Sequence, residues 1–246
     1  MPYSVIYLEW DIRMINSFVA LDVETSGLSP DNDKIIEIGM AKVLDGELID
    51  KYSTLINPKR IISSKIVELT GITQDMLEDK PAIEDIIDDI LEFIGDYPIL
   101  GHNINFDYGF LKKAAVNSGH SFEKQGIDTL KLARRLLPEV EHKNLDYLCN
   151  YFGIDAGNSH RAYDDAVSAW RLFLSLYNVK PDEEGFNELI TLSYSVKKDV
   201  PSTPAQRRYL LALINMHGIN IDEDIDSLTK SRASKLIDGI ISQYGR

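Results

Sequence analysis

Two carboxylates stand inside an apolar run near the start of the chain. Asp22 and Glu24 lie two residues apart in residues 18–28, where Phe18 and Val19 open a stretch that favours a β-strand. Side chains alternate along a strand, so both acids should point to the same side. Burying two like charges side by side costs several kcal/mol unless a proton or cation offsets it. The pair therefore predicts a divalent-metal site at the carboxyl end of a central strand, or else one acid is solvated at an edge.

Two later segments carry further acids in structured settings. Asp107 follows Phe106 in a predicted helix start, and its spacing from Asn103 predicts that the two share a helix face. Asp165 borders a stripe of small residues on a predicted helix, so it should face the sheet, with Asp164 more exposed. His160, just before that helix, could serve in catalysis or only cap the helix. His102 is expected to form structural hydrogen bonds.

The surrounding elements follow from hydrophobic period and turn residues. Besides the strand from residue 18, strands are expected at 35–43, 48–56, 98–101 and ending at 127–129. Asp45–Gly46 marks a hairpin turn. Helices are expected at 83–94, with a solvated acidic face, and at 64–69, 129–137, 144–152, 161–177, 203–218 and 229–244. Strands first, and then strands alternating with helices, predict an α/β domain with a mixed sheet flanked by helices.

Composition limits the class of protein. The 246 residues are 44% hydrophobic, ample for one sizeable core, and no apolar run approaches the length that spans a bilayer. Residues 1–13 lack the basic region of a secretory signal. A single cysteine, Cys149, excludes disulfides within the chain and favours a reducing, cytoplasmic location. The net charge of −13 argues against non-specific coating of nucleic acid, but not against a nucleic-acid enzyme with bound metals.

Three motifs in order resemble those of the DEDDh 3′→5′ exonucleases, the family of the proofreading epsilon subunit of bacterial DNA polymerase III. They are Leu21-Asp22-Val23-Glu24-Thr25-Ser26-Gly27-Leu28, His102-Asn103 with Phe106-Asp107, and His160-Arg161-Ala162 with Asp165-Ala166. Each motif is weak alone, and the ordered set is specific. The resemblance covers roughly residues 17–178.

The resemblance implies a ribonuclease H-like fold and two Mg²⁺ or Mn²⁺ ions. It implies that Asp22, Glu24, Asp107 and Asp165 are catalytic metal ligands and that His160 is the general base. It also implies that Thr25 lies beside the terminal 3′-hydroxyl, and that Leu28 and Phe106 contact the terminal base and sugar. The domains expected are an N-terminal extension (1–16), an exonuclease domain (17–180), a linker around one helix (181–202) and a helical module (203–246).

The implied activity is metal-dependent release of nucleoside monophosphates from the 3′ ends of single-stranded DNA, with a DNA polymerase as a candidate partner. DNA is favoured over RNA, although an exoribonuclease of the oligoribonuclease or RNase T type remains an alternative. A catalytically inert nucleic-acid-binding module and a glycosidase with paired carboxylates are weaker alternatives.

Two sets of basic residues are candidates for phosphate contacts, or else for solvated faces. The first set is Lys112, Lys113, Lys124, Lys131, Arg134, Arg135, Lys143 and Arg161, and the C-terminal set is Arg207, Arg208, Lys230, Arg232 and Lys235.

Overall fold

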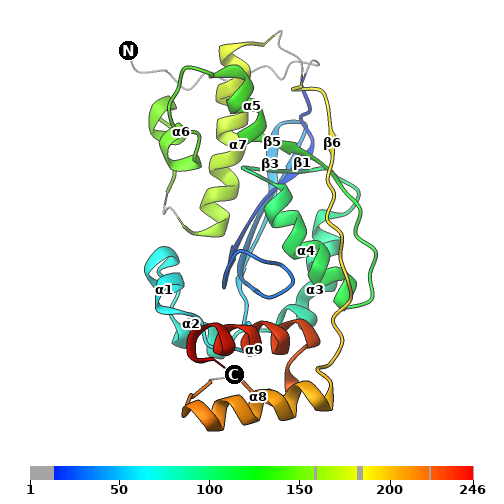
Figure 1. Cartoon of the computed structure of the whole chain (residues 1–246). Helices are drawn as coiled ribbons and strands as arrows, with labels where there is room; N and C mark the ends of the chain where they lie inside the picture. Colours follow the sequence, from blue (N-terminus) through cyan, green and yellow to red (C-terminus); the bar gives the residue numbers. More distant parts are fainter. Residues whose placement is uncertain (1–13, 158–159, 182–184, 222, 246) are drawn as a thin grey trace.

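A six-stranded mixed sheet forms the centre of the computed structural model, which describes residues 14–157, 160–181, 185–221 and 223–245 (Figure 1). The N-terminal extension lies almost entirely outside these residues. The strands are β1 (Phe18–Thr25), β2 (Ile35–Leu44), β3 (Glu47–Leu55), β4 (Ile99–Gly101), β5 (Gln125–Asp128) and β6 (Ile190–Thr191), in the order β3-β2-β1-β4-β5-β6. The predicted α/β class with a mixed sheet is confirmed.

The first three strands form an antiparallel unit that contains the predicted hairpin turn. β1 pairs antiparallel with β2 on one side and parallel with β4 on the other, so it is a central strand. Asp45 and Gly46 both have positive φ, at 49° and 83°, as a tight turn between β2 and β3 requires. The carboxyl ends of β1 and β4 therefore lie side by side, where side chains from both strands can meet.

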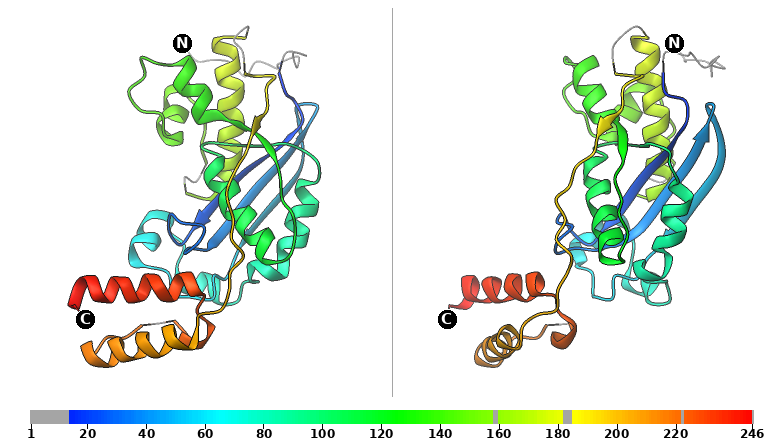
Figure 2. Two further views of the ribbon diagram at one scale, coloured as in Figure 1. Left: turned by 45° about the vertical axis from the view of Figure 1, so that its right-hand side comes forward. Right: turned by 90° about the vertical axis from the view of Figure 1, so that its right-hand side faces the viewer.

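Helices cover both faces of the sheet (Figures 1 and 2). On one face lie α3 (Ile83–Ile94) and α4 (Asn105–Asn117), and on the other lie α5 (Thr129–Leu136), α6 (Leu145–Phe152) and α7 (Ala162–Val179). Along β1, Phe18 and Ala20 pack into the core beneath α7, whereas Val19 and Leu21 pack into the core beneath α3 and α4. Asp22 continues the first series, so it points toward the α7 side.

Two short helices, α1 (Ser64–Thr70) and α2 (Gln74–Glu78), connect β3 to α3. The acidic side chains of α3, among them Glu84, Asp88 and Glu92, are exposed, as the sequence predicted.

The segment after α7 differs from the expected linker around one helix. Within the described residues 185–203 no helix forms, and Ile190–Thr191 pairs antiparallel with β5 as strand β6. Phe186 and Leu192 on either side are buried in the two cores. This segment thus adds the sixth strand to the sheet, because it pairs with the edge of β5 and its buried side chains on either side pack into the two cores.

The C-terminal helices form the predicted compact pair. α8 (Pro204–His217) and α9 (Lys230–Tyr244), joined through a 3₁₀ turn η1 (Ile225–Ser227), enclose a small core that includes Leu210, Leu213 and Ile237. The pair lies beyond the loop between β1 and β2, at one end of the molecule (Figure 2). In the described part of the chain, no helix combines the length and the apolar character needed to cross a membrane.

Candidate active site

The two acids of β1 lie on the face that α7 covers, and the start of α7 approaches the sheet closely. Asp22 is opposite Gly39 in the β1–β2 ladder. A Cβ placed on Gly39 would lie 2.0 Å from the backbone nitrogen of Tyr163, well inside van der Waals contact. Gly39 thus allows the first turn of α7, which carries Asp165, to lie directly against the strands beside Asp22.

Asp107 reaches the same place from the opposite layer. It lies in the first turn of α4, is 3% exposed, and accepts a hydrogen bond from the backbone N–H of Val23 at 3.0 Å. Val23 lies between Asp22 and Glu24, so this bond fixes Asp107 beside both acids. Asn103 does not share a helix face with Asp107 as expected, because α4 begins only at Asn105.

The turn before α4 has its own support. Asn103 has a φ of 73°, and its backbone N–H donates to Asp128 Oδ1 at 3.1 Å. His102 forms the structural hydrogen bonds that were predicted, through Nδ1 with the Thr129 hydroxyl at 2.9 Å and through Nε2 with the Lys143 carbonyl at 2.7 Å. Burial lowers the pKa of His102, which is consistent with a neutral ring held by two partners.

Asp165 and His160 complete the cluster from the start of α7. Asp165 is buried, and its Oδ2 accepts the backbone N–H of His160 at 3.1 Å. His160 has a φ of 64°, in the left-handed region that a residue other than glycine rarely adopts. One ligand atom from each of Glu24, His160 and Asp165 lies within 4.8 Å of the others.

Glu37 in β2 supports this turn, although no motif in the sequence singled it out. Its carboxylate, 1% exposed, accepts hydrogen bonds from the Arg161 guanidinium at 2.8–3.3 Å and from the Ala162 N–H at 3.3 Å. Glu37 is also opposite Glu24 in the ladder. A lone acid in the apolar strand 35–43 was the available signal, the same kind that singled out Asp22.

The cavity between these elements has a volume of about 250 Å³. Asp22, Glu24, Asp107, Asp165 and His160 all line it, together with Phe106. Its remaining lining residues are Val23, His102, Asn103, Asn144, Leu145 and Asp146. The last three lie at the start of α6, and the sequence did not predict that they would line the site. Four carboxylates that lie far apart in the sequence thus share one cavity.

Two of the expected substrate contacts do not line this cavity. Thr25 is buried, and its hydroxyl donates to the Gly27 carbonyl at 2.7 Å, which stabilises the turn after β1. Leu28 is 85% exposed on the adjacent loop. Phe106 alone of the three faces the cavity.

The carboxylates are held in an environment that favours protons or cations. Burial and the neighbouring acids raise the pKa of Asp22 well above its ordinary value. Burial is also the main cause that raises the pKa of Glu24 to about 7, of Asp107 to about 8 and of Asp165 to about 6. This set of hard oxygen donors, with a histidine nitrogen within reach, fits a divalent cation.

Three of the basic residues that were candidates for phosphate contacts already bind carboxylates or backbone carbonyls of the protein itself. Lys113 is 6% exposed and contacts Asp199 at 2.7 Å and Asp31 at 3.3 Å. Lys124 donates to backbone carbonyls, and Arg161 binds Glu37. These three side chains therefore have partners within the fold and are less available to bind phosphate.

The fold and the cluster of acids define an exonuclease of the ribonuclease H-like class. Residues 19–173 match the model of the exonuclease family named for RNase T. The chain belongs to this family, and its motif residues assign it to the DEDDh 3′→5′ exonucleases. The predicted family is therefore confirmed.

The most similar relatives include DNA polymerases of the PolC type. The DNA polymerase III PolC-type of Clostridium perfringens is 35% identical over 235 residues, which are 93% of this chain and 16% of that protein. That of Bacillus subtilis is 44% identical over 163 residues, 65% of this chain and 11% of that protein. The chain therefore spans less than a fifth of the length of these relatives.

Solved structures of exonucleases share the fold. Exonuclease X in complex with 5′ overhanging duplex DNA is 30% identical, with a TM-score of 0.53 over 67% of this chain and 93% of that chain. Escherichia coli exonuclease I in complex with single-stranded DNA, in a zinc-bound form, is 20% identical, with a TM-score of 0.62 over 68% of this chain and 41% of that chain. The second likeness concerns the fold alone.

Proposed function

We propose that the chain removes nucleoside monophosphates from the 3′ ends of single-stranded DNA by two-metal-ion hydrolysis. The observation that carries this proposal is the convergence of Asp22, Glu24, Asp107 and Asp165 with His160 around one cavity. Burial and, to a smaller extent, mutual repulsion raise the pKa values of these acids, and two divalent cations would offset that repulsion. Mg²⁺ and Mn²⁺ suit such oxygen donors.

Each residue then has a distinct task. Asp22, Glu24, Asp107 and Asp165 would hold the ions, which when bound supply an activated water and charge stabilisation at the phosphate. His160, in the turn just before α7, would accept the proton of the attacking water. Arg161 and Glu37 would keep that turn in place through their ion pair.

The terminal nucleotide has a matching set of contacts in this proposal. Phe106 faces the cavity and would pack against the terminal sugar or base, and Leu28 would extend over the base from the exposed loop. Thr25 would lie beside the 3′-hydroxyl through its backbone, because its own hydroxyl already donates to Gly27.

DNA is the substrate that the relatives favour, since they are named as DNA polymerases and since Exonuclease X was solved with DNA. The relatives also support a polymerase as the partner of this chain. A cytoplasmic location belongs to the same proposal, because the only cysteine, Cys149, is a free thiol and suits a reducing compartment. An exoribonuclease is the second candidate.

A direct assay separates these activities. Single strands of DNA and RNA with the same sequence, labelled at the 5′ end, are incubated with Mg²⁺ and then with EDTA. We expect progressive shortening of the DNA with release of monophosphates, arrest by EDTA, and slower shortening of the RNA. The matched control is Asp22→Asn, which keeps the shape of the side chain. Equal activity of that variant, or degradation in EDTA, would refute the proposed mechanism.

A further inference from the structure

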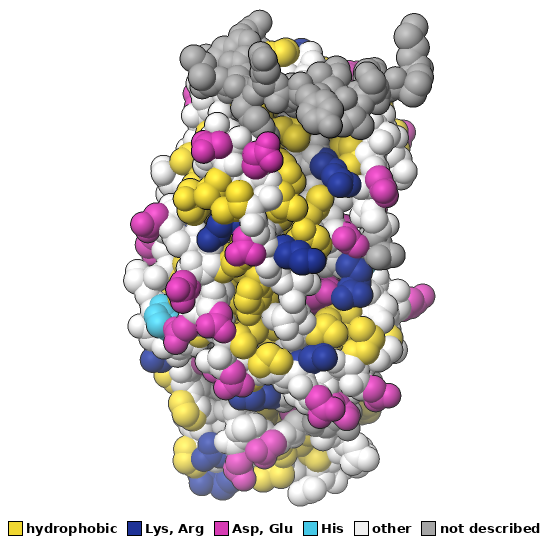
Figure 3. Space-filling view, turned by 180° about the vertical axis from the view of Figure 1, so that it is seen from behind, with side chains coloured by type: hydrophobic (Ala, Val, Ile, Leu, Met, Phe, Trp, Pro, Cys, Tyr) yellow, Lys and Arg dark blue, Asp and Glu magenta, His cyan; other side chains and the backbone are white. Residues whose placement is uncertain are grey.

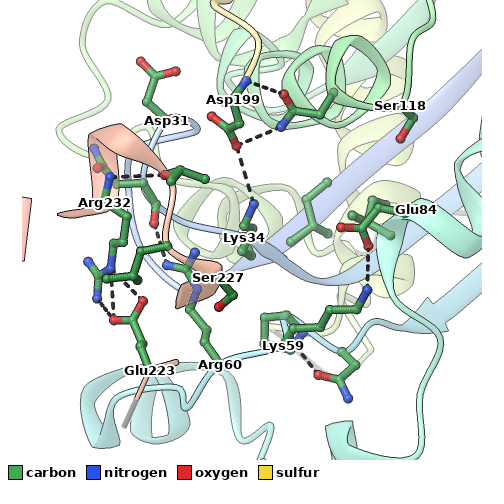
Figure 4. Close-up of a pocket in the computed structure, with 18 of the residues that line it drawn as sticks. Asp31, Lys34, Lys59, Arg60, Glu84, Ser118, Asp199, Glu223, Ser227 and Arg232 are labelled. Carbon is green, nitrogen blue, oxygen red and sulfur yellow. Dashed lines mark hydrogen bonds and ion pairs between the residues drawn. The ribbon is translucent and has the colours of Figure 1, made fainter. Parts of the chain in front are cut away.

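A second cavity lies between the nuclease core and the C-terminal helices (Figure 4). Its volume is about 600 Å³, more than twice that of the cavity with the four carboxylates. The nuclease core contributes Lys34 from the loop after β1 and Arg60 from the loop after β3, while Arg232 at the start of α9 closes the other side. The segment between α8 and α9 and the start of α9 thus form one wall of a polar chamber.

Five cations line this chamber, Lys34, Lys59, Arg60, Lys198 and Arg232, together with four carboxylates, Asp31, Glu84, Asp199 and Glu223. Lys59 contacts Glu84 at 3.5 Å, and three of the other cations differ in how closely a carboxylate engages them. Arg232 makes two contacts of 3.0 Å with Glu223 through its Nε. Arg60 donates to the Asn32 carbonyl at 2.6 Å and so uses one of its five N–H donors there. Lys34 lies 3.9 Å from Asp199, beyond hydrogen-bond distance. Lys34 and Arg60 therefore keep donors that can reach a ligand.

Electrostatics and an unpartnered hydroxyl agree with an anionic ligand. Burial is the main cause that lowers the pKa of both Lys34 and Arg60. A neighbouring acid raises each pKa in part, Asp199 for Lys34 and Glu223 for Arg60, and a neighbouring cation lowers each again. An anion between them would offset both effects. The hydroxyl of Ser118, at the end of α4, also lines the chamber, and it is buried without a hydrogen-bond partner among the described residues.

The chamber adjoins the site proposed for the terminal nucleotide. Lys34 and Ser26 exchange two hydrogen bonds, of 2.8 and 2.9 Å, and Ile35 is opposite Thr25 in the ladder. Neighbouring strands lie about 5 Å apart, so Lys34 is one strand spacing from the end of β1. A strand whose 3′ end occupies the catalytic cavity would reach Lys34 by passing the end of β1.

We propose that this chamber binds phosphodiester groups of the substrate strand on the 5′ side of its terminal nucleotide. The inference rests on the proposed exonuclease function and adds a role for the C-terminal helices. A local site is needed because the protein carries a net charge of −13. On the face seen in Figure 3, lysine and arginine are scattered among acidic side chains rather than gathered in one patch.

The test compares binding of single-stranded DNA of about 12 nucleotides by fluorescence anisotropy in EDTA, where the strand is not degraded. Lys34→Gln/Arg60→Gln should weaken binding by at least about 10-fold. It should also reduce the slope of log affinity against log salt by about 1 to 1.5, as expected for two lost phosphate contacts. Arg171→Gln/Lys180→Gln is the matched control, because it removes the same charges, and Arg171 likewise donates to a backbone carbonyl.

A second variant and two comparisons keep the outcome clear. Ser227→Glu adds a negative charge to the chamber wall without removing a cation, and it should weaken binding in the same direction. With Mg²⁺, the Lys34/Arg60 variant should lose more activity on the long strand than on a dinucleotide.

If wild-type protein degrades no strand, the proposed function fails. If it does, but both variants bind as the control does with an unchanged salt slope, the phosphate chamber is refuted. Binding of inorganic phosphate that depends on Lys34 and Arg60, without their effect on the strand, would also refute it.

Discussion

The carboxylate of Glu37 in β2 holds the guanidinium of Arg161, 124 residues away, through three contacts of 2.8–3.3 Å. Glu37 is almost completely buried, whereas the Arg161 side chain is 43% exposed. The pair joins the strand beside β1 to the turn that carries His160. The position of the proposed general base thus depends on a contact outside the catalytic cavity.

Breaking this pair should destabilise the protein and slow turnover. Arg161→Met leaves the buried charge of Glu37 without its partner, and it should lower the free energy of unfolding by about 1–3 kcal/mol. Adding Glu37→Gln to that variant removes the buried charge and should recover part of the loss. Urea denaturation of the two single variants and the double variant measures the coupling. Simple additivity of the single effects would contradict a direct interaction.

The stability of the metal-free protein should fall as the pH rises from about 4 to about 8. The pKa of Asp107 is raised to about 8 and that of Glu24 to about 7, so in this window the folded protein binds more protons than the unfolded chain. The contribution of these acids to stability is therefore greatest below the ordinary carboxyl pKa and is lost as the pH passes through the raised values.

Thermal unfolding in EDTA and in Mn²⁺, over this pH range, tests that prediction. Mn²⁺ should raise Tm more at about pH 8 than at about pH 5, because it replaces the protons that the acids lose. Asp107→Asn is the control, since it should flatten the pH dependence in EDTA. A Tm in EDTA that rises between pH 5 and 8 would show that the carboxylates do not repel one another as inferred.

Replacing His160 should affect turnover more than metal binding. General-base assistance is worth about 10²–10⁴-fold, so His160→Ala should reduce kcat by a factor in that range. The rise of Tm with Mn²⁺ should persist in this variant, whereas Asp165→Ala should lose it together with activity. A wild-type kcat in the His160→Ala variant would mean that His160 only caps the helix that follows it and takes no part in catalysis. Loss of the Mn²⁺ effect would assign His160 as a metal ligand.

A methyl group on Gly39 should displace the start of α7. The Cβ of Gly39→Ala would lie 2.0 Å from Tyr163 N, a backbone atom that cannot move aside cheaply. We expect a loss of stability of about 1–3 kcal/mol or more and a larger loss of activity. Gly239→Ala is the control, because nothing lies within 4 Å of its added Cβ in the middle of α9. That change should raise stability by up to about 1 kcal/mol.

The nuclease core should fold without the C-terminal helices if Asp199 is kept. Asp199 accepts from Asn117 at 3.0 Å and contacts the buried Lys113 at 2.7 Å, which ties the segment after β6 to α4. A chain ending at Val200 should therefore unfold cooperatively and shorten a DNA strand. A chain ending at Lys198 should have a lower Tm, because Lys113 loses a partner. Failure of both chains to fold would place the helices within the core.

Local pattern in the sequence was enough to predict most elements and the grouping of acids. The apolar period of residues 83–94 predicts the helix found at Ile83–Ile94, because burial of one face depends on side-chain spacing alone. The alternation of a strand likewise requires Asp22 and Glu24 to share one side. Asp45–Gly46 determines its own turn, since both residues tolerate positive φ.

Contacts between distant segments decided the rest, because their free energy depends on distances that no local pattern contains. Asn103 left the expected helix face because Asp128, from another strand, holds its backbone N–H. The need for Gly39 arises only where α7 crosses β2, and β6 is recognised as a strand only by its pairing with β5. The raised pKa values are likewise tertiary, since the sequence supplies the acids but only folding removes them from water and brings them within a few ångströms of one another.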